Sequence, residues 1–545
     1  MIKLFLILFL IYLSLVGYSL LFKKLIINST NYYFHNLDIF YGLFFVLIIA
    51  ITLNFFIPLE YYGYIFAPIG IFLLILLKKN YIFNNNFYSL FLFIFFFIFL
   101  SYSNSNLLAG DTSFYHLQTI KWFSKYKISF GLVNLEPRYG MNSLWHILIS
   151  IFNLPILNIN PIYYFNLILY AITFNEFYNK ENNSINKTSV LFLYLILIFL
   201  LIYSFIHPMI NGTIFLNLGS PEVDTVCMLL FFLSGYLFLK IEKLDNENYV
   251  NLILILVTIC VLTKLSYIFS ILFLFYIFYN KKKFLRLNLI PYVILINILW
   301  IIRNLIISGC AIFPLKITCF NFNWAYNLDH LELFSKIIRS FSRDTPLRER
   351  YMDFNHTLNT YDWINPWIKS YLLETALLII CLLISILSVV ILLLILVWSK
   401  KISLTKNFYF FLFVCALSLG LWFQAPEIRF GYGYIISFSL LLLAAIFKIT
   451  IKNFQFFSKQ ILNSLLIIII SLNLLKNSQN FDKLNKSIEH NFNYNNFILI
   501  SKKDDYEVYK PPATFNCGFF DGICVYQNGK YSVSSKLNYL KFIKK

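Results

Sequence analysis

The sequence predicts an all-α integral membrane protein, and three observations support this fold class. The chain has 545 residues, of which 59% are hydrophobic and 13% charged, whereas soluble proteins carry about 25% charged residues. Its apolar residues fall in runs of about 16 to 28 residues, and a run of about 18 or more can cross the ~30 Å core of a bilayer. Many of these runs end at lysine clusters, as the cytoplasmic ends of spans commonly do. The composition therefore excludes disordered, collagenous and ordinary cytosolic proteins.

Hydropathy predicts about fourteen transmembrane helices within a polytopic domain at 1–476. The first apolar run is too long for a secretory signal peptide and no small-residue cleavage site follows it, so we expect a retained helix. The runs 250–262 and 266–279 form either two short spans or one broken helix, and the region 144–174 either crosses the membrane or includes a re-entrant or surface-lying helix. The predicted spans are residues 2–22, 37–58, 62–77, 87–102, 161–174, 190–206, 223–239, 250–262, 266–279, 287–307, 371–398, 408–423, 432–447 and 461–475.

The lysine clusters also predict an orientation for these spans. Placing the lysine pairs at 23–24 and 78–79 in the cytoplasm puts both ends of the chain outside. External loops are then expected at about 103–143, 207–222, 308–369 and 424–431.

Two parts of the predicted outer face should have structure of their own. Trp363 and Trp367, just before a span, predict an amphipathic external-loop helix on the membrane surface. The segment 477–545 contains short alternating runs with turns at 511–512 and 528–529. It therefore predicts a small external C-terminal appendage that contains strands.

Four cysteines lie in segments that this topology places outside the cytoplasm. Disulfides persist in oxidising compartments, so the cysteines support an external face for these segments. We expect Cys517 to pair with Cys524 and Cys310 with Cys319. Four cysteines allow three pairings, and metal binding is the competing interpretation.

Three carboxylates lie at predicted outer ends of spans, where an ionisable residue invites a functional interpretation. Asp111 follows the fourth span and begins a predicted external helix that extends to about residue 126, so it is either an N-cap or a site residue. Glu222 and Asp224 lie at the start of another span and are either capping residues or further carboxylates over the same cavity. Asp111 with Glu222 or Asp224 could serve as the base that deprotonates a hydroxyl.

The cations available at the same face are few. Arg138, Arg303 and Arg429 lie at predicted outer positions, and arginine suits bidentate contact with phosphate. A salt bridge or a lipid headgroup contact is the alternative for each, and Glu427 could neutralise Arg429. His116, close to Asp111, would orient substrate or bind a metal, or be an ordinary buried polar residue. Lys264, between two apolar runs, is expected to snorkel to the surface.

The first external loop carries a resemblance to known proteins. An acidic residue after an early span, opening an external helix with a nearby Tyr or His, is similar to the first external loop of the GT-C superfamily of membrane glycosyltransferases. The stretches 111–118, 131–135 and 138–143, with Arg303 and the terminal cysteine pair, resemble a family of uncharacterised bacterial polytopic membrane proteins related to that superfamily. The resemblance covers most of the chain.

This resemblance implies a GT-C-like arrangement of helices and a glycosyltransferase activity. In that superfamily a sugar moves from a polyprenyl-phosphate carrier to an acceptor on the external face, and the first-loop carboxylate is the catalytic base or the ligand of a divalent metal. Asp111 is the matching position here. GT-C enzymes commonly carry paired acidic residues in this loop, whereas Asp111 has no acidic neighbour.

The expected location is the bacterial inner membrane, with the active face extracytoplasmic. The expected partners are the lipid bilayer, a polyprenyl-phosphate-sugar donor and an envelope glycan or glycolipid acceptor. A transporter or flippase of lipid-linked sugars is the alternative, and a polysaccharide polymerase or ligase is another. Transporters more often place polar residues at mid-membrane depth, so polar residues gathered at one face favour an enzyme. The sequence contains no basic domain, so we do not expect nucleic-acid binding.

Overall fold

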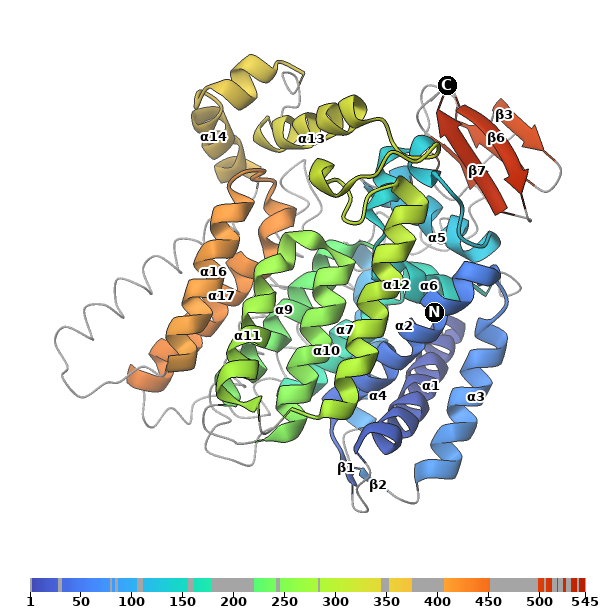
Figure 1. The fold of residues 1–545 in the computed structure, drawn as a ribbon. Helices are drawn as coiled ribbons and strands as arrows, with labels where there is room; N and C mark the ends of the chain where they lie inside the picture. Colours follow the sequence, from blue (N-terminus) through green and yellow to red (C-terminus); the bar gives the residue numbers. More distant parts are fainter. Residues whose placement is uncertain are drawn as a thin grey trace.

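The long apolar segments form helices because an apolar environment requires the backbone to satisfy its hydrogen bonds within the segment. In the computed structural model these helices run side by side as a bundle, with a small group of strands at one end (Figure 1). The structure describes residues 2–27, 32–78, 81–83, 87–104, 111–154, 161–178, 220–241, 246–282, 285–344, 352–374, 406–450, 498–503, 506–511, 517, 523–525, 531–536 and 539–544.

The predicted helical character is confirmed, and the α-helices follow most of the predicted spans that lie among these residues. In chain order they are α1 Ile2–Ile27, α2 Ile39–Phe56, α3 Gly63–Leu77, α4 Phe87–Asn104, α5 Leu117–Lys125, α6 Leu144–Ile151, α7 Asn166–Tyr178, α9 Val223–Lys240, α10 Glu247–Thr263, α11 Ile271–Asn280, α12 Ile290–Ser308, α13 Leu328–Arg343, α14 Ile364–Glu374, α16 Lys406–Trp422 and α17 Ile428–Thr450.

The predicted number of spans is not reproduced by the described residues. Four of their helical segments are long and apolar enough to cross a membrane, namely Ile2–Ile26, Asn36–Phe56, Val223–Lys240 and Leu287–Ser308. Other predicted spans form apolar helices of 10–17 residues, such as α3 and α10, which is short of the ~20 residues that a crossing needs. The predicted spans 190–206 and 461–475, and most of 371–398, lie outside the described residues.

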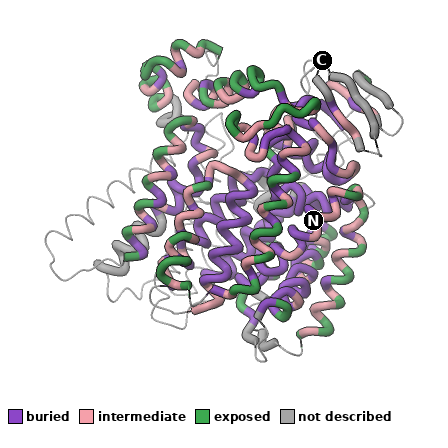
Figure 2. Tube along the Cα trace, viewed as in Figure 1, coloured by how far each residue is buried: buried purple, intermediate pink, exposed green. Residues whose placement is uncertain are grey.

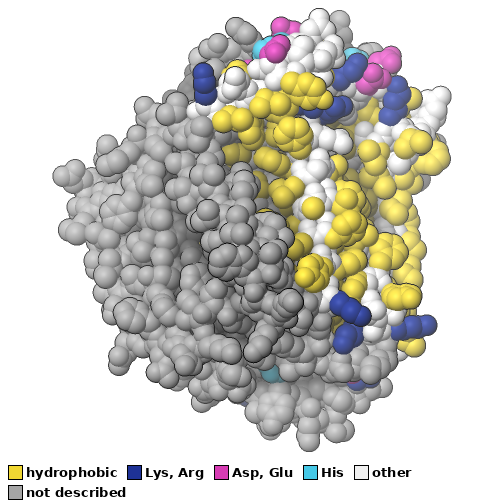
Figure 3. Space-filling view, turned by 90° about the vertical axis from the view of Figure 1, so that its left-hand side faces the viewer, with side chains coloured by type: hydrophobic (Ala, Val, Ile, Leu, Met, Phe, Trp, Pro, Cys, Tyr) yellow, Lys and Arg dark blue, Asp and Glu magenta, His cyan; other side chains and the backbone are white. Residues whose placement is uncertain are grey.

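The surface of the bundle fits an apolar surrounding. Buried residues fill its interior (Figure 2), while α3, α11 and α12 carry large exposed apolar side chains such as Phe72, Phe275 and Ile298. On one face, apolar side chains form a band with Lys and Arg side chains at both ends (Figure 3). Exposed apolar surface of this extent marks a membrane or protein contact rather than a surface in water. These apolar helices support a membrane protein.

Close backbone contacts join the first three helices. A Cβ atom on Gly17 of α1 would lie 1.8 Å from the Gly70 carbonyl oxygen of α3, and one on Gly42 of α2 would lie 2.1 Å from the Leu15 carbonyl oxygen. Only glycine fits at such crossings, which are a common way for helices to associate in membranes. These crossings fix α2, whose far end contacts the first predicted external loop.

The region 144–174 contains no membrane-crossing helix among its described residues. Helix α6 has only eight residues, all buried, and α7 begins at Asn166, five residues later than the predicted span. This agrees with the re-entrant or surface-lying alternative for α6. The helix packs against α2 and against α5, which is part of the first predicted external loop.

The C-terminal segment forms strands, as predicted, and it packs on the bundle. Its strands are β3 Ile498–Lys503, β4 Tyr506–Lys510, β5 Ile523–Cys524, β6 Tyr531–Lys536 and β7 Tyr539–Lys544; β3 pairs antiparallel to β4, β5 parallel to β4, and β6 antiparallel to β7. A further parallel pair, β1 Tyr32–Phe34 and β2 Tyr81–Phe83, lies at the opposite end of the bundle (Figure 1).

The contact between this segment and the first loop was not predicted. The Phe130 N–H donates to the Leu540 carbonyl at 2.8 Å, and the Phe542 N–H donates to the Phe130 carbonyl at 2.9 Å. The Cys524 N–H also donates to Oε1 of Gln118 in α5 at 3.1 Å. The segment is therefore tied to α5 rather than being a free appendage. Disulfides join Cys517 to Cys524 and Cys310 to Cys319, the pairing expected from the sequence.

Candidate functional site

Asp111 opens the first loop at the end of the bundle that carries α5 and the C-terminal strands. It precedes a π-helix, Thr112–His116, which continues directly into α5. Asp111 occupies the N-cap position, but its side chain makes no capping hydrogen bond. Instead Oδ2 accepts a hydrogen bond from Nη1 of Arg429 at 3.0 Å, and 27% of its side chain stays exposed. π-Helical turns are rare and frequent at functional sites.

Arg429 lies between two carboxylates in the first turn of α17. Its Nη1 reaches Asp111, and its Nε donates to Oε1 of Glu427 at 3.1 Å. The loop before α17 is held by tryptophans, because Nε1 of Trp422 donates to the Glu427 carbonyl at 2.7 Å and Nε1 of Trp367 donates to the Pro426 carbonyl at 3.1 Å. The tryptophan predicted to anchor a surface helix thus also fixes the position of Arg429.

The ion pair keeps both of its members charged. Burial acts to raise the pKa of Asp111, but the charges of Arg429, His116 and Arg138 and the hydrogen bond from Arg429 together outweigh it, and the pKa falls to about 2. Burial likewise acts to lower the pKa of Arg429, but the charges of Asp111 and Glu427 raise it well above its ordinary value. At neutral pH Asp111 is therefore a carboxylate of weak basicity, suited to holding Arg429.

Glu222 stands at the N-cap of α9 and is the least neutralised carboxylate of the group. Its side chain makes no capping hydrogen bond; Oε1 accepts from the Thr112 hydroxyl at 3.2 Å, and 8% of the residue is exposed. No Lys or Arg pairs with it among the described residues. Burial raises the pKa of Glu222 to about 7; the charge of Arg429 acts to lower this pKa, and the charges of Asp224 and Asp111 act to raise it. Glu222 therefore changes charge near neutral pH.

Asp224, in the first turn of α9, forms an ion pair with Lys264. Lys264 lies in extended conformation between α10 and the 3₁₀-helix Leu265–Ser270, and its Nζ is 4.3 Å from the centre of the Phe430 ring. The expectation that Lys264 snorkels to a surface is wrong, because its ammonium group points to Asp224 and Phe430. We call Asp111, Glu222, Asp224, Lys264, Glu427 and Arg429 the ion-pair cluster.

Arg138 and His116 lie beside this cluster. The Arg138 guanidinium is 5.5 Å from the centre of the Tyr115 ring and 3.6 Å from Glu136, and its charge lowers the pKa of Asp111. Nδ1 of His116 is 3.0 Å from Nε2 of His146 in α6. The structure thus brings together Asp111, Glu222 and Asp224 with Arg429, Arg138 and His116, although they come from distant parts of the chain.

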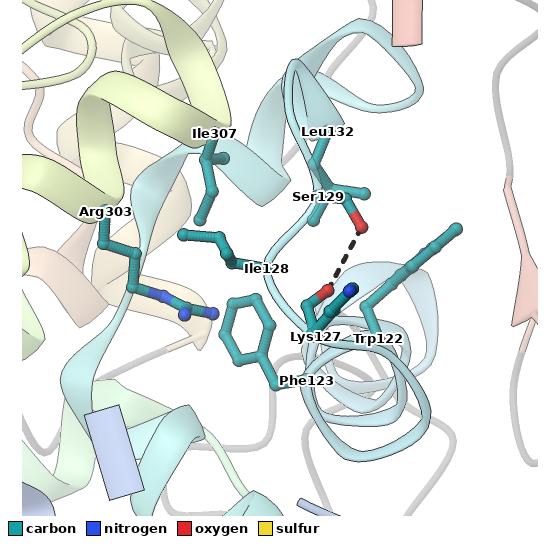
Figure 4. Close-up of a pocket in the computed structure, with 8 residues that line it drawn as sticks. All are labelled: Trp122, Phe123, Lys127, Ile128, Ser129, Leu132, Arg303 and Ile307. Carbon is teal, nitrogen blue, oxygen red and sulfur yellow. Dashed lines mark hydrogen bonds between the residues drawn. The ribbon is translucent and has the colours of Figure 1, made fainter. Parts of the chain in front are cut away.

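Arg303 does not belong to this group. It lies in α12, is 0% exposed, and donates to Oδ1 of Asn54 at 2.7 Å and to Oδ1 of Asn142 at 2.9 Å. Its guanidinium stacks 4.3 Å from the centre of the Phe123 ring. Among the described residues no carboxylate pairs with it. Figure 4 shows Arg303 pointing to Phe123, next to a narrow hollow also lined by Trp122, Lys127, Ile128, Ser129, Leu132 and Ile307.

Sequence reasoning missed several residues that shape the cluster. Thr112 and Ser220, which share a hydrogen bond beside Glu222, and His146, the partner of His116, carried no signal of their own. Lys264 did carry one, because an ionisable residue between two apolar runs invites a search for its partner. As for a metal, the described residues hold no group of three or more His, Cys, Asp or Glu side chains that could bind one.

The comparisons with known proteins give one match. A family model described as "Domain of unknown function (DUF8201)" matches residues 1–436. No curated protein and no solved structure matches the chain. The matched region includes every residue of the ion-pair cluster, whereas β3–β7 lie outside it.

Proposed function

The chain belongs to the DUF8201 family, and we propose that it is a glycosyltransferase of the GT-C type. In this proposal it transfers a sugar from a polyprenyl-phosphate-linked donor to an envelope glycan or lipid acceptor at the outer face of the bacterial inner membrane. The observation that carries the proposal is Glu222, a buried carboxylate with a pKa of about 7 that lies beside the Asp111–Arg429 ion pair.

Glycosyl transfer to a hydroxyl group needs a base and a cation. A general base works best when its pKa is near the working pH, and the pKa of Glu222 meets that condition. The departing phosphate needs positive charge that is already in place, and Arg429, held by Asp111 and Glu427, offers it. We assign Glu222 as the base, Arg429 with Arg138 as phosphate contacts, and Asp111 as the residue that positions Arg429.

The arrangement of the ends of the bundle supports an outward-facing site. Helices α5 and α13 and the C-terminal strands lie at one end (Figure 1). Asp111 lies just before the π-helix that continues into α5, the Cys310–Cys319 disulfide follows α12, and the Cys517–Cys524 disulfide belongs to the segment that is tied to α5. Lys78 at the end of α3 and Lys281 at the end of α11 follow helices that lead to the other end. Positive residues favour the cytoplasmic side, and disulfides favour the oxidising side. Both preferences support a position of the cluster on the outer side of the membrane.

The experiment that tests the proposal follows the donor and the product in a deletion strain. Complementation with the wild-type chain should restore an envelope sugar, whereas Glu222→Gln and Asp111→Asn should leave the sugar missing and the lipid-linked donor accumulating. Glu332→Gln is the matched control, because Glu332 is an exposed carboxylate at the same end that pairs with Lys316 and Lys336. Each variant is first checked for normal insertion in the membrane.

Vesicles with the purified protein and a labelled lipid-linked sugar separate the alternatives. A transferase consumes the donor only when the acceptor is present. A flippase moves the donor between leaflets without consuming it, and that result would replace the proposal.

A further inference from the structure

A buried hydrogen-bond network holds the turn that carries Glu222. Asn166, the first residue of α7, donates from Nδ2 to the Ser220 carbonyl and to the Glu222 carbonyl, each at 2.8 Å. Its Oδ1 accepts from Nε1 of Trp145 at 2.7 Å. Because the indole N–H can only donate, the orientation of the Asn166 amide is fixed, and both of its N–H groups are used. The backbone on either side of Pro221 is therefore fastened to α7.

Two hydroxyl groups then hold the side chain of Glu222. The Thr112 hydroxyl donates to Oε1 of Glu222 at 3.2 Å and shares a second hydrogen bond with the Ser220 hydroxyl, whose oxygen also accepts from the Glu222 N–H at 3.2 Å. A carboxylate can only accept, so the single Thr112 hydroxyl proton goes to Glu222, and Ser220 donates to Thr112. Thr112 and Ser220 are both 0% exposed, so solvent water does not compete for these bonds.

The two carboxylate oxygens of Glu222 therefore have different surroundings. Oε1 accepts the hydrogen bond from Thr112. Among the described residues, no hydrogen bond or ion pair reaches Oε2. A carboxyl group that is protonated carries its proton on one oxygen, and the oxygen without a donor is the one that can take it up. Thr112 thus fixes the rotation of the carboxylate and leaves Oε2 as the basic atom.

The residue before Thr112 holds the cation of the same site. Oδ2 of Asp111 accepts from Nη1 of Arg429 at 3.0 Å. Adjacent Cα atoms are about 3.8 Å apart across a trans peptide bond. A single peptide unit, at the start of the π-helix, therefore joins the contact with Arg429 to the contact with Glu222. A base and a cation act on one reacting group only if their spacing is fixed, and a misplacement of about 1 Å is costly.

We propose that Thr112 is the residue that orients the Glu222 carboxylate, and that the pair Asp111 and Thr112 sets the spacing between Glu222 and Arg429. The proposal deepens the proposed function and rests on it, because it names the residue that positions the proposed base. Thr112 is a positioning residue and not a catalytic one, since it acts only through Glu222. Asn166 and Ser220 support it by holding the turn.

The first test needs no catalytic activity. The full chain in nanodiscs is titrated across neutral pH by infrared spectroscopy, and the band of the protonated Glu222 carboxyl group is assigned by its loss in Glu222→Gln. Thr112→Val replaces the hydroxyl by a methyl group of similar size. Because the lost donor stabilised the charged carboxylate, the midpoint of the Glu222 titration should rise by about one pH unit. Thr112→Ser keeps the hydroxyl and should keep the wild-type midpoint.

The titration isolates the hydroxyl of Thr112 from other influences on Glu222. The charged groups that act on Glu222 are Arg429, Asp224 and Asp111, and Thr112→Val changes none of them. Thr112→Ala removes the same hydroxyl with less bulk and gives the same expected shift, so a valine variant that fails to insert does not end the test. An unchanged or lower midpoint in the variants without the hydroxyl, or an equal rise in Thr112→Ser, would overturn the proposal.

The transfer assay then tests positioning. Thr112→Val should lower kcat about tenfold even at alkaline pH, where Glu222 is ionised in both chains, and leave the KM for the donor unchanged. Its rate should rise with pH about one unit later than that of the wild type. Asp111→Asn should instead raise the donor KM, because it releases Arg429. Equal losses in Thr112→Val and Thr112→Ser, or a change in donor KM alone in Thr112→Val, would contradict the positioning role.

The two proposals fail in different ways. If Thr112→Val shifts the Glu222 titration as expected but no chain transfers sugar, the hydrogen bond stands and the transferase is lost. If the wild type transfers sugar and Glu222→Gln does not, while Thr112→Val keeps the wild-type titration and kcat, the transferase stands and the role of Thr112 is lost.

Discussion

Arg429 and Arg303 have similar sequence settings, each at a predicted outer end of a span, yet the structure gives them different surroundings. Arg429 keeps 18% of its side chain exposed and touches two carboxylates. Arg303 is completely buried and touches two asparagine oxygens and a phenyl ring. Arg429 is therefore a fixed positive charge at an accessible site, whereas Arg303 is a structural residue that connects helices.

The difference comes from where each helix lies around the bundle. Arg303 joins α12 to Asn54 of α2 and to Asn142 before α6, and Asn54 in turn donates to the carbonyls of Phe123 and Tyr126 in and after α5. Removing Arg303 would therefore disturb four segments at once. Arg429 instead contacts Asp111 and Glu427, and its charge acts on Glu222, which is bonded to Thr112.

The largest expected effect is a loss of stability in Arg303→Met. The change leaves Oδ1 of Asn54 and Oδ1 of Asn142 without the guanidinium donor, and an orphaned buried acceptor costs about 1–3 kcal/mol. We expect the free energy of unfolding to fall by about 4 kcal/mol, measured by denaturation in detergent. A variant that is as stable as the wild type but unable to transfer sugar would contradict the structural role and indicate that Arg303 acts in the functional site.

The sequence predicts part of this difference between Arg429 and Arg303, because hydropathy locates residues along a helix but not around the bundle. Apolar runs and lysine clusters predict the helices and the height of a residue along them, and so they placed Asp111, Glu222 and Arg429 at one level. They do not show which side of a helix faces the other helices. For that reason the sequence placed Arg303 in the same group as Arg429. The partners of Lys264 and Cys524 were also beyond reach, because Asp224 is 40 residues from Lys264 and Gln118 is 406 residues from Cys524.

The next effect is on activity and comes from Arg429→Lys. Lysine keeps the charge near Asp111 but cannot reach Asp111 and Glu427 with the fixed fork of a guanidinium. We expect the transfer rate to fall about hundredfold, as when one preorganised donor to a developing anion is lost, with little change in the unfolding midpoint. Arg303→Lys is the matched variant and should show the reverse pattern. If both variants changed the transfer rate and the unfolding midpoint in the same way, Arg429 could not be distinguished as a site residue from Arg303 as a structural residue.

A smaller effect is the pH dependence that Glu222 gives to stability. Its folded pKa of about 7 is above the unfolded value of about 4.5, so the folded state binds the proton more tightly. The stability that this contributes is complete below pH 4.5 and is lost as the pH rises through 7. Asp111 behaves in the opposite sense, because its pKa of about 2 makes its contribution disappear as the pH falls from 4 to 2.

Glu222→Gln measures this effect directly. Between pH 5 and 8 the wild-type chain should lose about 2 kcal/mol more stability than the variant, because glutamine does not titrate. The wild-type transfer rate should rise over the same range as Glu222 becomes ionised. Parallel stability curves for the two chains would show that Glu222 does not titrate near neutral pH, and the assignment of the base would fall with it.

The smallest effect is expected from Glu332→Gln, and it tests whether charge pairing alone makes a site. Glu332 in α13 pairs with Lys316 at 3.1 Å and with Lys336 at 3.0 Å, distances close to that of Asp111 and Arg429. Its side chain is about half exposed, so water and salt screen both pairs. We expect no measurable change in the unfolding midpoint or the transfer rate at low or high salt. A clear loss of transfer would mean that general negative charge at this end matters, and the specific role of the ion-pair cluster would no longer explain the activity.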